Sequence, residues 1–151
     1  MKVLGFAFTK MNANRQNKFD IRCNKSINID FSEIVKEGAI DLVKSDAIYT
    51  ISFGYTVAYL EPGTKKENKQ AEIVLEGILT ISLDKNEDKD FSKTYKKKEM
   101  NNKLKEVLFN FLLRKCTPRA IDLEDQLNLP SHIAIPQVRL ENAKDTEKQS
   151  K

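Results

Sequence analysis

The sequence predicts an α+β domain, in which an antiparallel sheet is built first and helices then pack on one of its faces. Alternation of apolar and polar residues, typical of strands, dominates the first 83 residues. Helical spacing takes over near residue 96. The clearest alternation is AIYTISFGYTVAYL, which begins at Ala47 and places large apolar residues at odd positions and small or polar residues at even ones.

The expected strands follow one another along the first half of the chain, separated by turn residues such as Pro62 and Gly63. Each places its apolar residues on one side, as expected for a sheet with one solvated face. The spacing between the last two strands is that of a hairpin. The segments are KVLGFAFTK (2–10), FDIRC (19–23), INIDF (27–31), AIYTISFGYTVAYL (47–60) and AEIVLEGILTISL (71–83).

The helical region follows a charged segment, DKNEDKD (84–90), which we expect to be a solvated loop. Apolar residues then recur at i, i+3, i+4, i+7 and i+8 and predict a helix from Lys96 to Cys116 that Pro118 ends. Thr117 is a suitable N-cap with Pro118 in the first turn, which predicts a short second helix. The residues that show the spacing are Leu104, Val107, Leu108, Phe111 and Leu112.

The last apolar segment, LPSHIAIPQVRL (129–140), contains two prolines and alternating isoleucines, so we expect an extended chain lying against another surface. From Glu141 onward the chain has no large apolar residue and is expected to be disordered. The expected organisation is therefore one domain over residues 1–140 and a charged tail over residues 141–151.

One helix should leave part of the sheet uncovered. A helix is about 10 Å wide, whereas four strands spaced about 4.8 Å apart form a wider layer. Apolar surface should therefore remain for a partner molecule.

The composition favours a soluble, cytoplasmic protein. The two cysteines, Cys23 and Cys116, are too few for a disulfide-dense secreted domain, and the N-terminal apolar run is too short for a signal peptide. The net charge is +4, but lysine supplies most of the 26 basic residues and alternates with acidic residues. A solubilising surface explains this pattern better than a nucleic-acid site does.

Residues with catalytic potential are few. His132 is the one histidine of the chain, and a Cys–His pair or a fragment of a metal site would need a third group that the spacing does not provide. Phosphate-binding glycine loops and hydrolase motifs are absent. FSKTYKKKEM (91–100) could contact single-stranded nucleic acid through Tyr95 and its lysines, but the approach to a helix is the favoured interpretation. We therefore expect no enzyme, no cofactor and no metal.

The order of these segments resembles the SecB family of protein-export chaperones and its SecB-like relatives, including those attached to toxin–antitoxin systems. INIDF, the long strand pair, the long helix and LNLPSHIAIP (127–136) carry this resemblance, which covers about Leu4 to Leu140. It implies a four-stranded antiparallel sheet, one long helix and a short C-terminal helix on one face, and a homo-oligomer that is a dimer of dimers.

The resemblance also implies a function. SecB-type proteins bind non-native polypeptides in long apolar grooves without ATP, which implies a holdase. The alternative is an adaptor whose groove binds one dedicated protein partner, such as an antitoxin. The basic isoelectric point, about 9.0, does not match the acidic surface with which export SecB contacts its motor. The positions that match the groove are Phe19, Ile21, Leu127, Leu129, Ile133 and Ile135.

Overall fold

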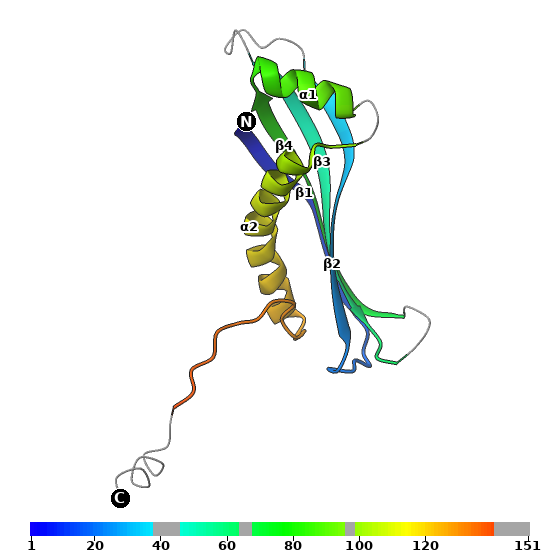
Figure 1. Ribbon diagram of the computed structural model, residues 1–151. Coiled ribbons are helices and arrows are strands. Elements are labelled where there is room, and N and C mark those ends of the chain that lie inside the picture. The colour runs from blue at the N-terminus through cyan, green and yellow to red at the C-terminus, as the bar shows by residue number, and fades with distance from the viewer. Residues whose placement is uncertain (38–45, 64–67, 96–98, 141–151) are drawn as a thin grey trace, which may run out of the picture.

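The computed structural model describes residues 1–37, 46–63, 68–95 and 99–140. Four antiparallel strands form one sheet in the order β1-β4-β3-β2, so β1 and β2 are its edges. Two helices lie on the same face: α1 crosses one end of the sheet, and α2 runs toward the other end (Figure 1). The elements are β1 (Lys2–Arg15), β2 (Asn24–Lys36), β3 (Ala47–Leu60), β4 (Lys69–Leu83), α1 (Lys85–Tyr95) and α2 (Asn102–Gln126). The predicted α+β class with a four-stranded antiparallel sheet is confirmed.

The core lies between the two central strands and the helices. The odd-numbered residues of β3 from Tyr49 to Tyr59 are buried, as the sequence alternation predicts, and β4 contributes the matching row. Gly77 on β4 pairs with Phe53 and makes close packing possible: a Cβ there would lie 2.3 Å from the Ala7 carbonyl oxygen and 2.7 Å from the Phe53 ring. A larger residue at position 77 would separate β1 from β4 or displace Phe53.

A β-bulge changes the alternation within the edge strand β2. The pairing with β3 shifts between Phe31 and Glu33. Because a bulge inserts one extra residue, Phe31 and Ile34 both face the helices although they are three positions apart. The inward residues of β2 are therefore Ile29, Phe31, Ile34 and Lys36, which pair with Tyr55, Phe53, Ile51 and Tyr49 of β3.

The segment FDIRC is a turn and not the predicted strand. The Asp20 side chain accepts a hydrogen bond from the backbone N–H of Arg22 at 2.9 Å, and the Cys23 N–H donates to the Asp20 carbonyl at 3.2 Å. An aspartate that bonds the backbone two residues ahead stabilises a turn, and this local bond outweighs the alternation of three apolar residues.

The charged segment after β4 begins helix α1 and is not the predicted loop. Asp84 accepts from the backbone N–H groups of Asn86 and Glu87 at 2.9 Å, and Glu87 accepts from the Asp84 N–H at 3.1 Å. This reciprocal pair is a capping box. Phe91 is the buried residue that anchors the helix to the sheet. Apolar spacing alone misses such a helix, because most of its surface is charged.

Helix α2 continues through Pro118, and the predicted break and separate short helix are absent from the described residues. Its buried residues recur every four positions, at Leu108, Leu112, Cys116, Ala120 and Glu124, so one row faces the sheet on both sides of the proline. Pro118 and Arg114 are exposed. The Arg114 carbonyl, which would accept from an N–H at position 118, therefore lies on the solvent side, where the missing bond costs least because solvent is accessible. The predicted start at Lys96 lies outside the described residues.

Apolar surface remains on the helix-facing side of the sheet, as predicted. Ile27 on β2 is 44% exposed, and Val3 and Met11 on β1 are exposed to similar degrees. Among the described residues no helix is long and apolar enough to cross a membrane. The predicted tail, 141–151, falls outside the described residues.

Candidate functional site

Of the six residues expected to form a groove, Phe19 and Ile21 lie at the end of the sheet that contains Tyr59, and the other four lie in the segment that follows α2. Phe19 packs edge-on against Tyr59, with ring centroids 6.0 Å apart, and lines a shallow pocket together with Ile21. Leu127 packs against the core, and Leu129 belongs to it with 8% exposure. Ile133 and Ile135 are exposed. Two of the six residues therefore line a pocket, two pack in or against the core, and the last two are exposed on the surface. Their role in binding a client remains a prediction.

A buried polar cluster explains how the chain after α2 is held in place; we call Tyr55, Tyr59, Glu124 and His132 the C-terminal clasp. Glu124 is 2% exposed, and its Oε1 accepts from the His132 backbone N–H at 2.9 Å, from His132 Nδ1 at 2.6 Å and from the Tyr59 hydroxyl. His132 Nε2 lies 2.9 Å from the Tyr55 hydroxyl. With the proton on Nδ1, the imidazole donates to the carboxylate and accepts from Tyr55, so one tautomer satisfies both bonds.

The clasp also shifts the pKa values of Glu124 and Tyr59. Burial disfavours the charged Glu124 carboxylate, but hydrogen bonds from His132 and Tyr59 outweigh burial and lower the pKa of Glu124 below its usual value. Burial and the neighbouring carboxylate raise the pKa of Tyr59. Glu124 Oε2 is buried without a partner among the described residues. The sequence did not indicate a role for His132. In the structure its side chain and its backbone N–H both hydrogen-bond the Glu124 carboxylate.

The turn that leads into the clasp follows the sequence LNLP. Asn128 adopts a positive φ of 52°, which asparagine tolerates well. The Leu129 N–H donates to the Glu124 carbonyl at 2.8 Å. An asparagine in the left-handed region just past a helix end is a common C-terminal cap, so Asn128 was the sequence signal for the end of this helix.

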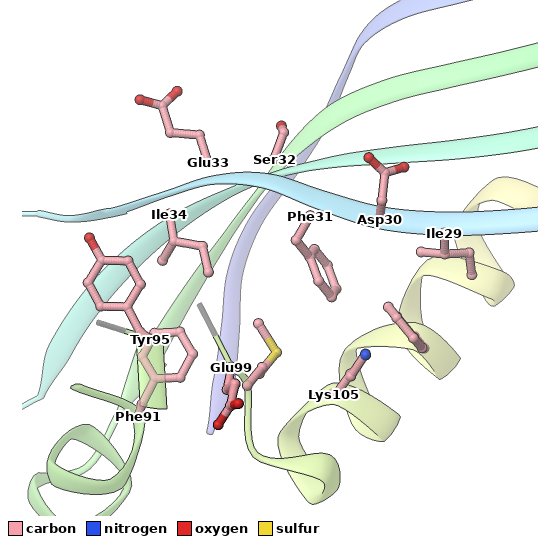
Figure 2. Close-up of a pocket in the computed structure, with 12 residues that line it drawn as sticks. Ile29, Asp30, Phe31, Ser32, Glu33, Ile34, Phe91, Tyr95, Glu99 and Lys105 are labelled. Carbon is pink, nitrogen blue, oxygen red and sulfur yellow. The ribbon is translucent and has the colours of Figure 1, made fainter. Parts of the chain in front are cut away.

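A larger pocket lies at the edge of the sheet, between β2 and the two helices; we call it the edge pocket (Figure 2). Its volume is about 690 Å³. Figure 2 shows Phe31 and Ile34 pointing toward the helices, whereas Asp30, Ser32 and Glu33 point to the opposite side of β2. The lining residues are Ile29, Asp30, Phe31, Ser32, Glu33, Ile34, Phe91, Tyr95, Glu99, Met100, Lys105 and Phe109.

Aromatic contacts shape the wall formed by α2. Phe31 stacks on Phe109 with centroids 5.3 Å apart, which connects β2 to the helix. Lys105 lies over the Phe109 ring, 5.4 Å from its centroid. These contacts leave the rings at the border of the pocket, where an incoming apolar side chain would meet them.

The wall formed by α1 is fixed by a second carboxylate. Asp88 accepts from the Tyr49 hydroxyl at 2.5 Å and from Lys36 Nζ at 3.0 Å. Burial opposes ionisation of Asp88, but these hydrogen bonds outweigh it and lower the pKa of Asp88. Phe91 packs against Tyr49 and stacks on Tyr95 with centroids 6.0 Å apart. Asp88 thereby positions two aromatic residues of the pocket.

The edge pocket is suited to binding an apolar chain. Seven of its lining side chains are apolar or aromatic, and the adjacent strand β2 has no strand partner on its outer side among the described residues. No group of His, Cys, Asp and Glu among these residues could hold a metal ion. The sequence analysis predicted the strand INIDF but missed this site, because one wall is helix α1, which was expected to be a loop.

Comparison with known proteins identifies the fold. No protein-family model matches the chain, and no curated protein matches its sequence. Among solved structures, the SecB-like chaperone Rv1957 of Mycobacterium tuberculosis, in complex with a ChAD peptide from the Rv1956 HigA1 antitoxin, is similar, with a TM-score of 0.51 and 10% sequence identity. The alignment covers 93% of this chain and 92% of that chain. The chain therefore has a SecB-like fold.

Proposed function

We propose that this protein binds extended apolar segments of non-native polypeptides, as an ATP-independent holdase with a SecB-like fold. The observation that carries the proposal is the edge pocket: an open, mostly apolar cavity of about 690 Å³ beside the unpaired edge of β2. A peptide can add to such an edge through main-chain hydrogen bonds while alternate side chains enter a pocket.

The lining indicates which client side chains would anchor. A large aliphatic or aromatic residue would lie between Phe31, Phe109 and Tyr95, where rings offer both faces and edges. Burying one such side chain contributes roughly 1.5–3 kcal/mol. Two or three anchors together with main-chain hydrogen bonds to β2 would offset most of the cost of ordering the peptide, which gives the weak, reversible capture that a holdase requires.

The residues expected from the sequence extend this path. Below the edge pocket, the β2 residues Ile27 and Lys25 pair with Val57 and Tyr59, and Phe19 packs on Tyr59. A client that leaves the pocket along β2 would therefore reach Phe19 and Ile21, and would pass the segment that contains Leu127, Leu129, Ile133 and Ile135. We propose that these residues form the second, shallower part of the binding surface.

Suppression of aggregation tests the pocket. Phe109→Ser removes an aromatic wall of the edge pocket, and Leu113→Ser removes an exposed apolar residue of the same helix outside it. We expect the first to weaken stoichiometric suppression of the aggregation of a denatured client, and the second to leave it unchanged. Circular dichroism must show both variants folded. Equal suppression by both would refute the site.

A second function has its own support, because the similar solved structure is bound to a peptide from one antitoxin. An adaptor with one dedicated partner would use the same pocket. Purification from the native cell separates the two: a holdase returns many unfolded polypeptides, and an adaptor returns one protein in fixed ratio. In either case we propose a cytoplasmic homo-oligomer, a dimer of dimers, which would cover the apolar surface left at β1 and β2.

A further inference from the structure

The eight residues after the clasp, 133–140, form an exposed apolar arm. Figure 1 shows this segment running away from the sheet and α2. Val138 and Leu140 are 89% and 87% exposed, and Ile133 and Ile135 also lie on the surface. Four large aliphatic side chains in one short unpaired segment are unusual for a soluble chain unless they contact a partner.

The spacing of the arm matches that of the edge pocket. Its aliphatic residues lie at 133, 135, 138 and 140, with steps of two, three and two residues. The bulge gives β2 the same steps, since its inward residues are at 29, 31, 34 and 36. In antiparallel register Leu140 lies opposite Ile29, Val138 opposite Phe31, and Ile135 opposite Ile34. These three apolar residues of the arm would then point into the pocket, and Ile133 would lie opposite Lys36, outside the pocket lining.

Charge selects the direction of pairing. In the antiparallel register Arg139, the one charged residue of the arm, lies opposite Asp30, and both point away from the pocket. Opposite charges across a strand pair are favourable. In a parallel register Arg139 would lie opposite Val35. In the antiparallel arrangement, therefore, three aliphatic residues of the arm face the pocket and Arg139 also lies opposite a residue of opposite charge.

The antiparallel register requires a second molecule. Lys25 Nζ donates to the Ser131 carbonyl at 2.8 Å, so the arm starts beside the first residues of β2. Antiparallel pairing would place Ile133 beside Lys36, eleven residues farther along β2, or about 36 Å away. Two residues of chain from Ser131 span about 7 Å at most. Pro136 also holds Ile135 in an extended conformation, which disfavours a reversal within the arm.

We propose that residues 133–140 of one protomer pair with the edge of β2 in a second copy and fill its edge pocket. The exchange is reciprocal, because each copy carries one arm and one pocket. This inference rests on the proposed function only in using the same pocket, and it adds regulation: the arm and a client segment compete. Clients would then bind best when the arms are displaced.

Two chain lengths test the exchange. A chain ending at Leu140 lacks only the residues beyond the arm, whereas a chain ending at His132 lacks the arm but keeps the clasp. Sedimentation equilibrium should give a mass for the shorter chain that is half that of the longer one or less. The shorter chain should also bind a model apolar peptide more tightly. Equal masses would overturn the proposal whatever the peptide affinity, and absence of peptide binding in both chains would refute the proposed function alone.

Cross-linking tests the register. Ser32 and Gln137 lie directly opposite in it, so Ser32→Cys with Gln137→Cys, in a Cys23→Ser background, should form a disulfide between chains and a band of twice the mass. Asn12→Cys, on the opposite edge strand β1, replaces Ser32→Cys as the control and should give no such band. A disulfide within one chain, or none, would overturn the exchange.

A charge swap provides an independent check. Arg139→Asp should weaken the association of full chains, and adding Asp30→Arg should restore it. Both residues are exposed, so neither change threatens the protomer fold. Failure of the double variant to recover would contradict the pairing of Arg139 with Asp30.

Discussion

The two ends of β3 offer the same chemistry in different surroundings. Near its start, the Tyr49 hydroxyl donates to Asp88 of α1, and near its end, the Tyr59 hydroxyl donates to Glu124 of α2. The Asp88 side chain is 24% exposed and pairs with the half-exposed Lys36. The Glu124 side chain is 3% exposed and pairs with a fully buried His132.

This difference in burial indicates different roles. A carboxylate in contact with water keeps part of its hydration if a partner is lost, whereas a buried one does not. The Glu124 end should therefore be rigid and important for folding. The Asp88 end should tolerate movement, which suits the wall of a pocket that must admit a chain.

The largest effect is expected for Glu124→Ala. The substitution leaves His132 Nδ1 and the His132 backbone N–H without their acceptor, and buried unsatisfied groups cost about 1–3 kcal/mol each. The Tyr59 hydroxyl loses one acceptor but keeps the Pro130 carbonyl oxygen at 3.0 Å. We expect a loss of roughly 3–5 kcal/mol in the free energy of unfolding, measured by urea denaturation. Asp125→Ala, one position along and exposed, is the control and should cost less than about 1 kcal/mol. Equal losses would show that the clasp is not important for stability.

Acid should weaken the same end. Because the folded-state pKa of Glu124 is lowered, the unfolded chain binds the proton more tightly. The stabilisation by the carboxylate is complete above the unfolded pKa, about 4.3, and is lost as pH falls through the lower folded value. Unfolding free energies between pH 7 and pH 3 should therefore fall more steeply for the native chain than for Glu124→Gln. Asp88 also has a lowered pKa, but it is present in the native chain and in the Glu124→Gln variant alike. The difference between their two pH profiles of unfolding free energy therefore comes from Glu124.

Tyr49 and Tyr59 both belong to the row of large apolar residues at odd positions from Ala47 onward, and this alternation predicted the central strand of the sheet correctly. Alternation is a local property, so strands β3 and β4 could be read from spacing alone. The helical spacing placed Leu108 and Leu112 correctly on the inward face of α2, but Val107, which it placed there too, is 45% exposed. Helix α1 could not be predicted from spacing, because Phe91 is its one buried residue and a single apolar position shows no helical repeat. Asp84 and Glu87 did offer the sequence signal of a helix cap. The clasp joins Tyr59 to Glu124 and Tyr55 to His132, which are 65 and 77 positions apart, and the edge pocket joins β2 to both helices. No local pattern encodes such contacts.

The matched pair of tyrosine substitutions separates the two ends directly. Tyr59→Phe removes a donor from a buried carboxylate, and hydrogen bonds to charged groups contribute about 1.5–3 kcal/mol. Tyr49→Phe leaves Asp88 with Lys36, Ser92 and water, so we expect a loss of about 0.5–1.5 kcal/mol. Urea denaturation of the two variants gives the comparison. A larger loss at Tyr49 would reverse the assignment of the rigid end.

The smallest effect is expected at the pocket wall, and it should appear in binding before it appears in stability. Asp88→Ala frees α1 from Tyr49 and Lys36, so Phe91 and Tyr95 would no longer be held at one position beside Ile34. A loosened wall must be reordered when a chain enters, and an ordering cost near 1 kcal/mol corresponds to about a fivefold weaker affinity for a model apolar peptide. Fluorescence anisotropy measures the affinity, and hydrogen exchange should show faster opening of α1. Asp90→Ala, on the same helix but outside the edge pocket, should change neither. If Asp88→Ala accelerates exchange in α1 and leaves peptide affinity unchanged, the client does not contact this wall, and the binding surface must lie farther along β2, toward Ile27 and Phe19.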